Sequence, residues 1–466
     1  MDERHPEPAP RGPSPEPEVL PQGFPAAHEQ GGERVATALA SVPQPTESVP
    51  FRQIAPILLA QLTMCVAAIT PTAYSLAVWL ERIAPEQKDA LLPVAVGVPS
   101  LLIIFLGPIV NVLSDRTRSR FGRRRTWVLV GMTAGTLGSL LIALVPSIPT
   151  VIIGWTVASN GYSIMSAMIL VHFSDRLPEH QRGRVMGLAG AITQLGPLVG
   201  VIAAGALAEL PAMLFLLPAG LALLGNGVFA AVMKDPQYTG VRPPLDLRGL
   251  AQGYWFNPRR YPNLGWVWLN KAFIYLALSV MTLYSVYLLS SRLGLEQIQV
   301  AGIVSLSGMF GVGGAILAAI GAGVLSDRLQ KRKPFLVVAA VVLAGGLVLV
   351  GTAGSVVQFV IGTVINAMAA GIYGAVDQAL QLDVLPAGED QNGRYLAVLS
   401  LAQQIPQGIG PFLAGAVLAL AGGEYGWVYF VAAGCALVSI LAVAPIRIGR
   451  SAAEPAAAAP VPVAAP

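Results

Sequence analysis

Two ionisable residues in the second half of the chain lie inside apolar stretches. Lys271 lies in WVWLNKAFIYL and Asp377 lies in GIYGAVDQAL. If both stretches are helices, Lys271 lies about two turns, or roughly 10 Å, inside its helix. Asp377 lies at a similar depth in a helix that runs the opposite way. Equal depth allows the two side chains to form an ion pair.

An ionisable group at this depth in an apolar stretch is costly, and such groups commonly have a function. Three interpretations remain open. The two residues form a structural ion pair, or Asp377 takes up a proton or another cation and releases Lys271. In the third interpretation, one of the two side chains binds a solute directly.

A second unusual feature is the segment SDRTRSRFGRRR, residues 114–125, which holds six arginines and Asp115 between two apolar stretches. Arginines in a short connection set the orientation of the neighbouring helices and contact anionic lipid. Asp115 is expected at a helix C-terminus, where a negative charge is unfavourable. It therefore needs a partner, and the candidates are a neighbouring arginine and the N-terminus of a facing helix.

Polar and aromatic residues near the middle of the apolar stretches form a third set of candidates. Each either forms a hydrogen bond with a neighbouring helix or contacts a solute. The set consists of Gln61, Tyr74, Asn160, Tyr162 and Gln194 in the first half, and Tyr284, Asn366, Tyr373, Gln378 and Gln403 in the second.

The elements that position these residues follow from composition. The chain has 466 residues, of which 54% are hydrophobic and 12% are charged. Several apolar stretches reach the length of about twenty residues that crosses a bilayer as a helix. The sequence therefore predicts an all-α membrane protein. The two cysteines both lie in apolar stretches and are interpreted as packing residues.

Apolar stretches between charged or Pro/Gly breaks predict twelve transmembrane helices. The connections on one side hold 22 Lys and Arg residues, and those on the other hold only Arg82, Lys88 and Arg292. Because basic connections stay in the cytoplasm, we expect both termini to be cytoplasmic. This asymmetry explains the net charge of +4 without a nucleic-acid partner. The twelve helices are predicted near 53–80, 90–113, 126–146, 150–173, 184–208, 211–233, 264–290, 298–325, 334–353, 356–382, 395–420 and 426–446.

The two halves of the chain repeat each other. LSDR at 113–116 recurs at 325–328, Asp175 matches Asp383, and Pro197 matches Pro411, at offsets between 208 and 214. A repeat of this kind predicts two pseudo-symmetric six-helix bundles. The expected organisation is a disordered cytoplasmic tail at 1–50, bundles at 51–233 and 264–448, a cytoplasmic central loop at 234–263 and a second disordered tail at 449–466.

LSDR…GRRR after the second helix and LSDRLQKRKP after the eighth resemble the signature loop of the major facilitator superfamily. The longer form DRTRSRFGRRR resembles the glycoside–pentoside–hexuronide branch of sugar symporters. Asn111 departs from the superfamily's pattern, which has Gly there. The resemblance implies that the loop carboxylates and their arginines hold the cytoplasmic side closed. The residues implied are Asp115, Arg116, Gly122, Arg123, Arg124, Gly323, Asp327 and Arg328.

The resemblance also implies that the helices of Lys271 and Asp377 approach a central cavity. The sugar-symporter branch binds its cation through carboxylates in the second and fourth helices, and this chain has none there. We therefore expect proton coupling through Asp377, or uniport, and not sodium coupling by that route. GAITQLGPLVG (190–200) partly resembles a motif of drug/proton antiporters, although packing of small residues around a proline kink is the preferred explanation.

The resemblance implies a secondary active transporter in the plasma membrane that carries a small organic solute, sugar-like as a first expectation, by alternating access. The alternative is efflux of drugs or secondary metabolites by proton antiport. No P-loop, H-E-x-x-H or G-x-S-x-G motif occurs, so we expect neither an enzyme nor a cofactor. The expected partners are a small-molecule substrate, a proton or other cation and the lipid bilayer, with no nucleic acid, and the protein is expected to be a monomer.

Overall fold

The computed structural model of this protein describes residues 49–233, 235, 256–384 and 392–446. Within these residues every element is a helix. Most of both predicted tails, and most of the predicted central loop, lie outside the described residues. The first-half helices are α2 (Phe51–Thr70), η1 (Pro71–Ser75), α3 (Leu76–Ile83), α4 (Lys88–Arg116), α5 (Arg123–Leu144), α6 (Ile148–Arg176), α7 (Glu179–Ala206) and α8 (Met213–Val232).

The second half repeats this order. Its helices are α10 (Pro262–Leu283), α11 (Ser285–Leu293), α12 (Gln297–Leu329), α13 (Lys333–Gly351), α14 (Val356–Asp383), α15 (Asn392–Leu420) and α16 (Gly426–Val443). In the described part of the chain, ten helical spans have the length and composition to cross a membrane. α6 and α15, of 29 residues each, complete the twelve long segments.

Charged residues mark where the long helices end. α4 begins at Lys88 and ends at Arg116, and α5 begins at Arg123. Charged side chains stay in water at the ends of an apolar span, so the sequence predicts these boundaries well. Among the helix starts, the largest difference is at α7, which is predicted to begin at 184 and begins at Glu179. The extra turn is polar, and hydropathy alone does not include it.

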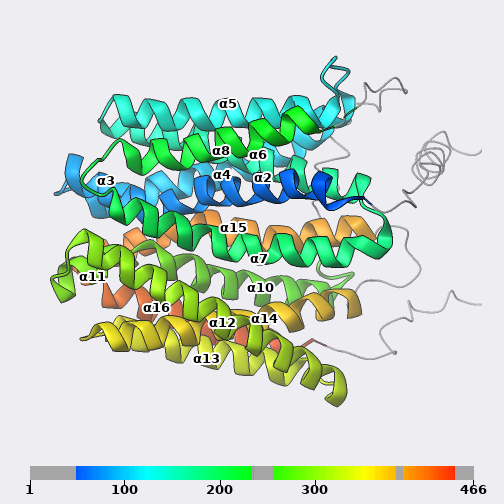
Figure 1. The fold of residues 1–466 in the computed structure, drawn as a ribbon. Coiled ribbons are helices and arrows are strands. Elements are labelled where there is room, and N and C mark those ends of the chain that lie inside the picture. The colour runs from blue at the N-terminus through cyan, green and yellow to red at the C-terminus, as the bar shows by residue number, and fades with distance from the viewer. Residues whose placement is uncertain (1–48, 234, 236–255, 385–391, 447–466) are drawn as a thin grey trace, which may run out of the picture. The chain divides into compact units, whose positions relative to one another are not determined.

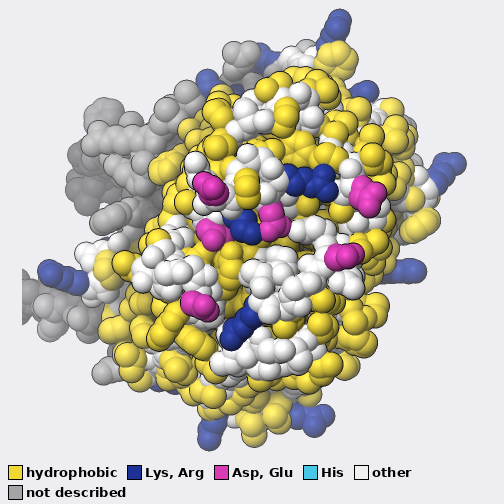
Figure 2. All heavy atoms as spheres, turned by 90° about the vertical axis from the view of Figure 1, so that its left-hand side faces the viewer, with side chains coloured by type: hydrophobic (Ala, Val, Ile, Leu, Met, Phe, Trp, Pro, Cys, Tyr) yellow, Lys and Arg dark blue, Asp and Glu magenta, His cyan; other side chains and the backbone are white. Residues whose placement is uncertain are grey.

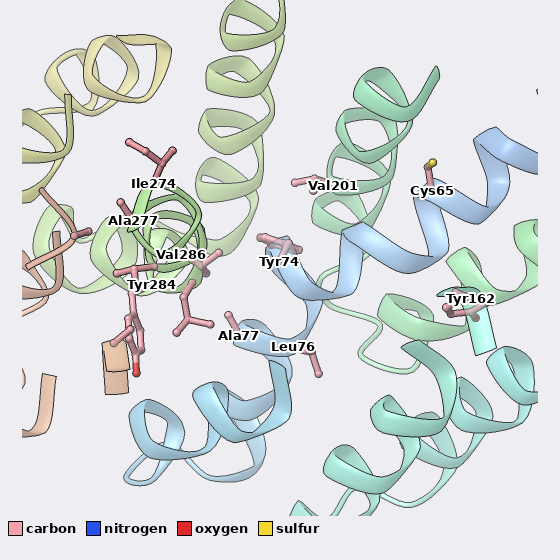
Figure 3. Close-up of a cluster of buried hydrophobic side chains, with 14 of the residues drawn as sticks. Cys65, Tyr74, Leu76, Ala77, Tyr162, Val201, Ile274, Ala277, Tyr284 and Val286 are labelled. Carbon is pink, nitrogen blue, oxygen red and sulfur yellow. The ribbon is translucent and has the colours of Figure 1, made fainter. Parts of the chain in front are cut away.

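The first helix of each half is interrupted at equivalent places. In the first half, the π-helical turn η1 begins at Pro71, which has no N–H to donate to the preceding turn. In the second half, α10 ends at Leu283 and α11 begins after Tyr284. The two positions differ by 212 residues, the offset at which LSDR repeats. Figure 3 shows Tyr74 and Ala77, from the first interrupted helix, opposite Tyr284 and Val286.

Helices within each half pack against one another, and two pairs make the most extensive contacts between the halves. α2 packs on α7 and α8, and α5 on α6, whereas α12 packs on α14 and α10 on α16. α4 packs on α15, and α7 packs on α12, across the two halves. In Figure 1, the first-half helices (blue to green) and the second-half helices (green to red) run side by side.

The helices meet water at two ends of different composition. We call the end with residues 114–125 and 326–333 the Arg end. The opposite end, with residues 81–89, 284–297 and 424–426, we call the Tyr end. Figure 2 views the Tyr end, where acidic side chains lie among apolar ones. Its charged residues are acidic Glu81, Glu86, Asp89, Glu209, Glu296 and Glu424, and basic Arg82, Lys88 and Arg292.

Candidate functional site

The structure brings Lys271 and Asp377 together. Lys271 Nζ on α10 lies 3.1 Å from Asp377 Oδ2 on α14. Lys271 is 5% exposed and Asp377 is 3% exposed. Taking two charges out of water is costly unless geometry and further hydrogen bonds compensate. The surroundings of the pair therefore decide what it can do.

Hydrogen bonds extend this pair across three helices. Gln381 Nε2 donates to Asp377 Oδ2 at 2.6 Å. The Tyr373 hydroxyl lies 3.0 Å from Asn270 Oδ1 and 3.5 Å from Asp377 Oδ1. Asn270 Nδ2 donates to the carbonyl oxygen of Ser439 on α16 at 3.1 Å. The charge state of Asp377 is thus connected to α10, α14 and α16.

Sequence reasoning missed Gln381 and Asn270 as members of this network, although it singled out Tyr373. The sequence did contain a signal for Gln381. Residues 373, 377 and 381 are spaced by four, which places them on one face of a helix. Asn270 directly precedes Lys271. Its bond to a backbone carbonyl of α16 depends on packing between helices and has no sequence signal.

Lys271 also faces an aromatic ring. Its Nζ lies 5.7 Å from the ring centroid of Tyr275, one turn further along α10, a cation–π distance. Tyr275 packs edge-to-face on Tyr373, with ring centroids 6.2 Å apart. The ammonium group therefore keeps a favourable neighbour if Asp377 loses its charge. A proton on Asp377 would weaken the link between α10 and α14 without leaving Lys271 alone.

At the Arg end, the motif of the first half forms a compact cluster. Arg124 Nη2 lies 2.8 Å from Asp115 Oδ1, and its Nη1 donates to Ser114 Oγ at 3.0 Å. Ser114 is fully buried. Of the two kinds of partner predicted for Asp115, the structure therefore shows the neighbouring arginine. The bond joins α4 to the start of α5 within the first half.

The second half repeats this cluster with a different arginine. Arg332 Nη1 donates to Ser326 Oγ at 3.0 Å and to Asp327 Oδ1, and its Nε donates to Asp383 Oδ2 at 3.3 Å. The hydrogen bonds to Asp327 and Asp383 raise the pKa of Arg332, so it stays charged. The sequence indicated Arg328 and missed Arg332 and both serines. The serine of LSDR was visible in both copies.

Asp235 is a further residue of the Arg end that sequence reasoning missed. It follows α8, and its Oδ2 accepts from the backbone N–H groups of Arg124 and Arg125 at 2.7 and 2.8 Å. N–H groups in the first turn of a helix have no acceptor within the helix itself, so Asp235 supplies one at the positive end of α5. Gly122 precedes them with a φ of 92°, and a Cβ there would meet the Asp235 carboxyl. Glycine is thus required at position 122 because of the positive φ and because a side chain there would clash with Asp235, which caps α5.

We expect Asp235→Ala to lower the free energy of unfolding by about 1–2 kcal/mol, because two donors at a helix N-terminus lose a charged acceptor. Asp235→Asn should retain most of the stability, since Asn is a good cap. Thermal unfolding of the purified variants measures this. Glu86→Ala, in an exposed connection, is the control, and an Asp235→Ala variant as stable as that control would contradict the assignment.

The ten predicted pathway residues divide by their contacts. In the first half, Gln61 bonds to Thr193, and Tyr162 bonds to Ser139. Asn160 bonds to the carbonyl oxygens of Pro99 and Thr156. These three residues therefore pack helices of the first half together. Asn366 is buried where α14 faces α13. Tyr74 and Tyr284 bond across the halves at the Tyr end. Gln194 and Gln378 are exposed, and Gln403 is half-buried.

Sequence comparison with known proteins gives the family. The profile of the Major Facilitator Superfamily matches residues 62–322 and 305–465. The multidrug efflux pump Tap of Mycolicibacterium fortuitum is 26% identical over 109 residues, which is 23% of this chain and 27% of Tap. The multidrug resistance protein Stp of Mycobacterium tuberculosis is 30% identical over 105 residues, 22% of this chain and 20% of Stp. The chain thus matches about a quarter or less of these relatives.

Solved structures share the fold at low sequence identity. The nucleoside transporter NupG superimposes with a TM-score of 0.66 at 13% identity, covering 84% of this chain and 98% of NupG. A D-xylose–proton symporter superimposes with a TM-score of 0.64 at 15% identity, covering 85% of this chain and 97% of the symporter. The profile match covers most of the sequence, and the helices adopt the matching fold. The chain therefore belongs to the Major Facilitator Superfamily, a family of membrane transporters.

Proposed function

We propose that this protein is a proton-coupled secondary transporter of a small organic solute. The observation that carries the proposal is the buried Lys271–Asp377 pair, 3.1 Å apart, within a network that joins α10, α14 and α16. A proton that binds Asp377 removes the negative partner of Lys271. The packing of α10 against α14 and α16 then changes with the protonation state, which is what coupling requires.

We also propose that the Arg end faces the cytoplasm and that both termini lie there. The support is the distribution of charge, with 22 Lys and Arg in the connections of that side and three at the Tyr end. In this orientation the arginine clusters around Asp115 and Asp327 lie on the cytoplasmic side. We infer that Arg124 and Arg332 hold the loop geometry on which cytoplasmic closure depends.

For the substrate, we propose an uncharged, hydroxyl-bearing molecule such as a sugar. The charges of Lys271 and Asp377 neutralise one another. The neighbouring Gln378 and Tyr275 provide an amide and a phenol group that can form hydrogen bonds with a substrate. An exposed amide at membrane depth is costly against lipid, which supports a water-accessible position for Gln378. The resemblance of the loop DRTRSRFGRRR to sugar symporters points to the same class.

A second candidate is efflux of drug-like molecules by proton antiport. The observation that favours it is the similarity to Tap and Stp, which are named for multidrug efflux and resistance. Both candidates use the same proton site and differ in direction. Uptake of labelled sugars and of a cationic dye into vesicles of defined orientation, under an imposed proton gradient, distinguishes them.

The proton role is tested with Asp377→Asn in reconstituted vesicles. We expect the variant to lose accumulation of solute driven by a proton gradient and to retain exchange of labelled for unlabelled solute, because Asn keeps the shape but cannot take up a proton. Thr363→Val, in the same helix and away from the pair, should keep gradient-driven accumulation, because its hydroxyl bonds only to the carbonyl oxygen of Phe359 within α14. Equal loss of both activities in a folded Asp377→Asn variant would favour the structural interpretation of the pair.

A further inference from the structure

Among the residues that the structure describes, five hydrogen bonds join the two halves at the Tyr end, and we call them the closing contacts. From the second half, Tyr284 donates to the carbonyl oxygen of Asp89 at 2.7 Å, and Tyr287 donates to that of Ala77 at 3.0 Å. In the reverse direction, Tyr74 donates to the carbonyl oxygen of Gln297 at 2.8 Å. The other two reach carboxylates: Tyr425 to Asp89 at 2.8 Å and Gln297 to Glu81 at 2.7 Å.

Three of the five acceptors are backbone carbonyls inside or beside helices, and such carbonyls normally accept the N–H of the residue four positions later. For Asp89 that residue is Pro93, which lies inside α4 and has no N–H. The Asp89 carbonyl is therefore free of its helical partner. It is this oxygen that accepts the Tyr284 hydroxyl, at 2.7 Å.

Pro93 and Tyr284 both lie beside Gly415, where α4 packs on α15. A Cβ built on Gly415 of α15 would lie 2.7 Å from Pro93 Cγ and 3.6 Å from the Tyr284 hydroxyl. Tyr284 is fully buried, so its hydroxyl needs an acceptor within the protein. The proline supplies that acceptor, in the same way that prolines free carbonyls in other membrane helices.

The side chain of Asp89 also accepts a hydrogen bond, from a residue beside a second helix of the other half. Its Oδ1 accepts from Tyr425, which directly precedes α16, while its backbone oxygen accepts from Tyr284 at the end of α10. The adjacent Lys88 bonds Glu81 at 2.5 Å and lies 4.7 Å from the ring centroid of Tyr287. The first turn of α4 thus contacts α10, α11 and α16 of the other half at once.

We propose that Pro93 and Asp89 are positioning residues of the gate at the Tyr end. Pro93 frees one carbonyl for Tyr284, and the Asp89 carboxylate holds Tyr425, so that together they favour the conformation in which the Tyr end is closed. The proposal rests on membership of the superfamily and on these contacts. It does not depend on the proton role of Asp377, so the two can fail separately.

The test measures how far the two halves separate at the Tyr end. Nitroxide labels on Glu86→Cys and Gly354→Cys, both exposed and outside the closing contacts, report the distance by pulsed electron resonance in a background with Cys65→Ala and Cys435→Ala. We expect Tyr284→Phe to raise the population with the longer distance about two- to tenfold, the effect of losing one net hydrogen bond. Pro93→Ala should raise it less, because a carbonyl can accept two hydrogen bonds.

The decisive comparison is the double variant. If Pro93 acts through Tyr284, then Pro93→Ala has no further effect once the hydroxyl is removed by Tyr284→Phe. If Pro93 acts only by packing against Gly415, its effect persists in the Tyr284→Phe background, which would overturn the proposal. Pro108→Ala, in the same helix away from the Tyr end, is the matched control and should leave the distances unchanged. Pro93→Ser replaces Pro93→Ala if the latter does not fold.

The hydrogen bond between Tyr425 and the Asp89 carboxylate is tested in the same way. Asp89→Ala removes the acceptor of Tyr425 and keeps the backbone oxygen that Tyr284 uses. Tyr425→Phe should therefore have no effect in that background, whereas Tyr284→Phe should retain its full effect. Tyr429→Phe, whose hydroxyl faces Ser285 within the second half, is the control. Unchanged distances in both Tyr284→Phe and Tyr425→Phe would contradict a gate role for these contacts.

Discussion

Lys271→Met is expected to lower the stability of the folded protein by about 3–5 kcal/mol, because it leaves the Asp377 carboxylate buried without its cationic partner. The loss should be visible as a large drop in the midpoint of thermal unfolding in detergent. Both residues are almost completely buried, so water cannot replace the missing ammonium group.

The double variant Lys271→Met/Asp377→Leu separates stability from function. Replacing both charges by apolar groups is often neutral for stability, so we expect the unfolding midpoint to recover most of the loss. Gradient-driven transport should stay absent in the double variant, since no carboxylate remains to take up a proton. Recovery of both stability and accumulation would show that the pair has only a structural role.

The second large effect is expected where α4 crosses α15. A Cβ on Gly97 would lie 2.8 and 2.9 Å from two ring carbons of Phe412, and a third ring carbon would be nearer still. We expect Gly97→Val to disfavour the packed crossing by about 1–3 kcal/mol, which reduces the ratio of closed to open protein at the Tyr end by about 5- to 150-fold. Transport should fall accordingly, because alternating access needs both conformations.

A second-site change and a matched glycine test this explanation. Phe412→Ala removes the ring and should restore transport to Gly97→Val. Gly107→Val, ten residues further along the same helix, adds its side chain to open space and should have little effect. If Phe412→Ala failed to restore transport, the loss would have to come from α4 itself and not from the crossing.

Much of the fold could be predicted from the sequence because the bilayer constrains it strongly. The lengths of apolar stretches determined where the helices lie, with boundaries within a few residues of those observed. The interruption at Pro71 was not predicted, although the proline that begins it is visible in the sequence. The equivalent interruption at Tyr284 was not predicted either, because no proline or glycine marks it and the span near 264–290 was expected to be one helix.

The candidate site was predictable in part. Two charges at equal depth in antiparallel helices indicated the Lys271–Asp377 pair, because depth follows from counting residues at 1.5 Å each. The partners of the Arg end were harder to predict. Of the many arginines nearby, Arg124 and Arg332 are the ones that bond to the buried serines Ser114 and Ser326. Asp235, which accepts from the start of α5, lies more than a hundred residues away in the sequence.

The sequence by itself determined that this chain is a duplicated set of membrane helices whose basic residues gather at one end. Hydrophobicity, charge and repeats are properties of segments, so a linear pattern is enough to read them. Only the tertiary structure decided that Tyr284 and Tyr425 bind Asp89 and that Tyr74 binds Gln297. Those bonds depend on which helices cross at the Tyr end, and a hydroxyl finds its acceptor through distances that no single segment contains.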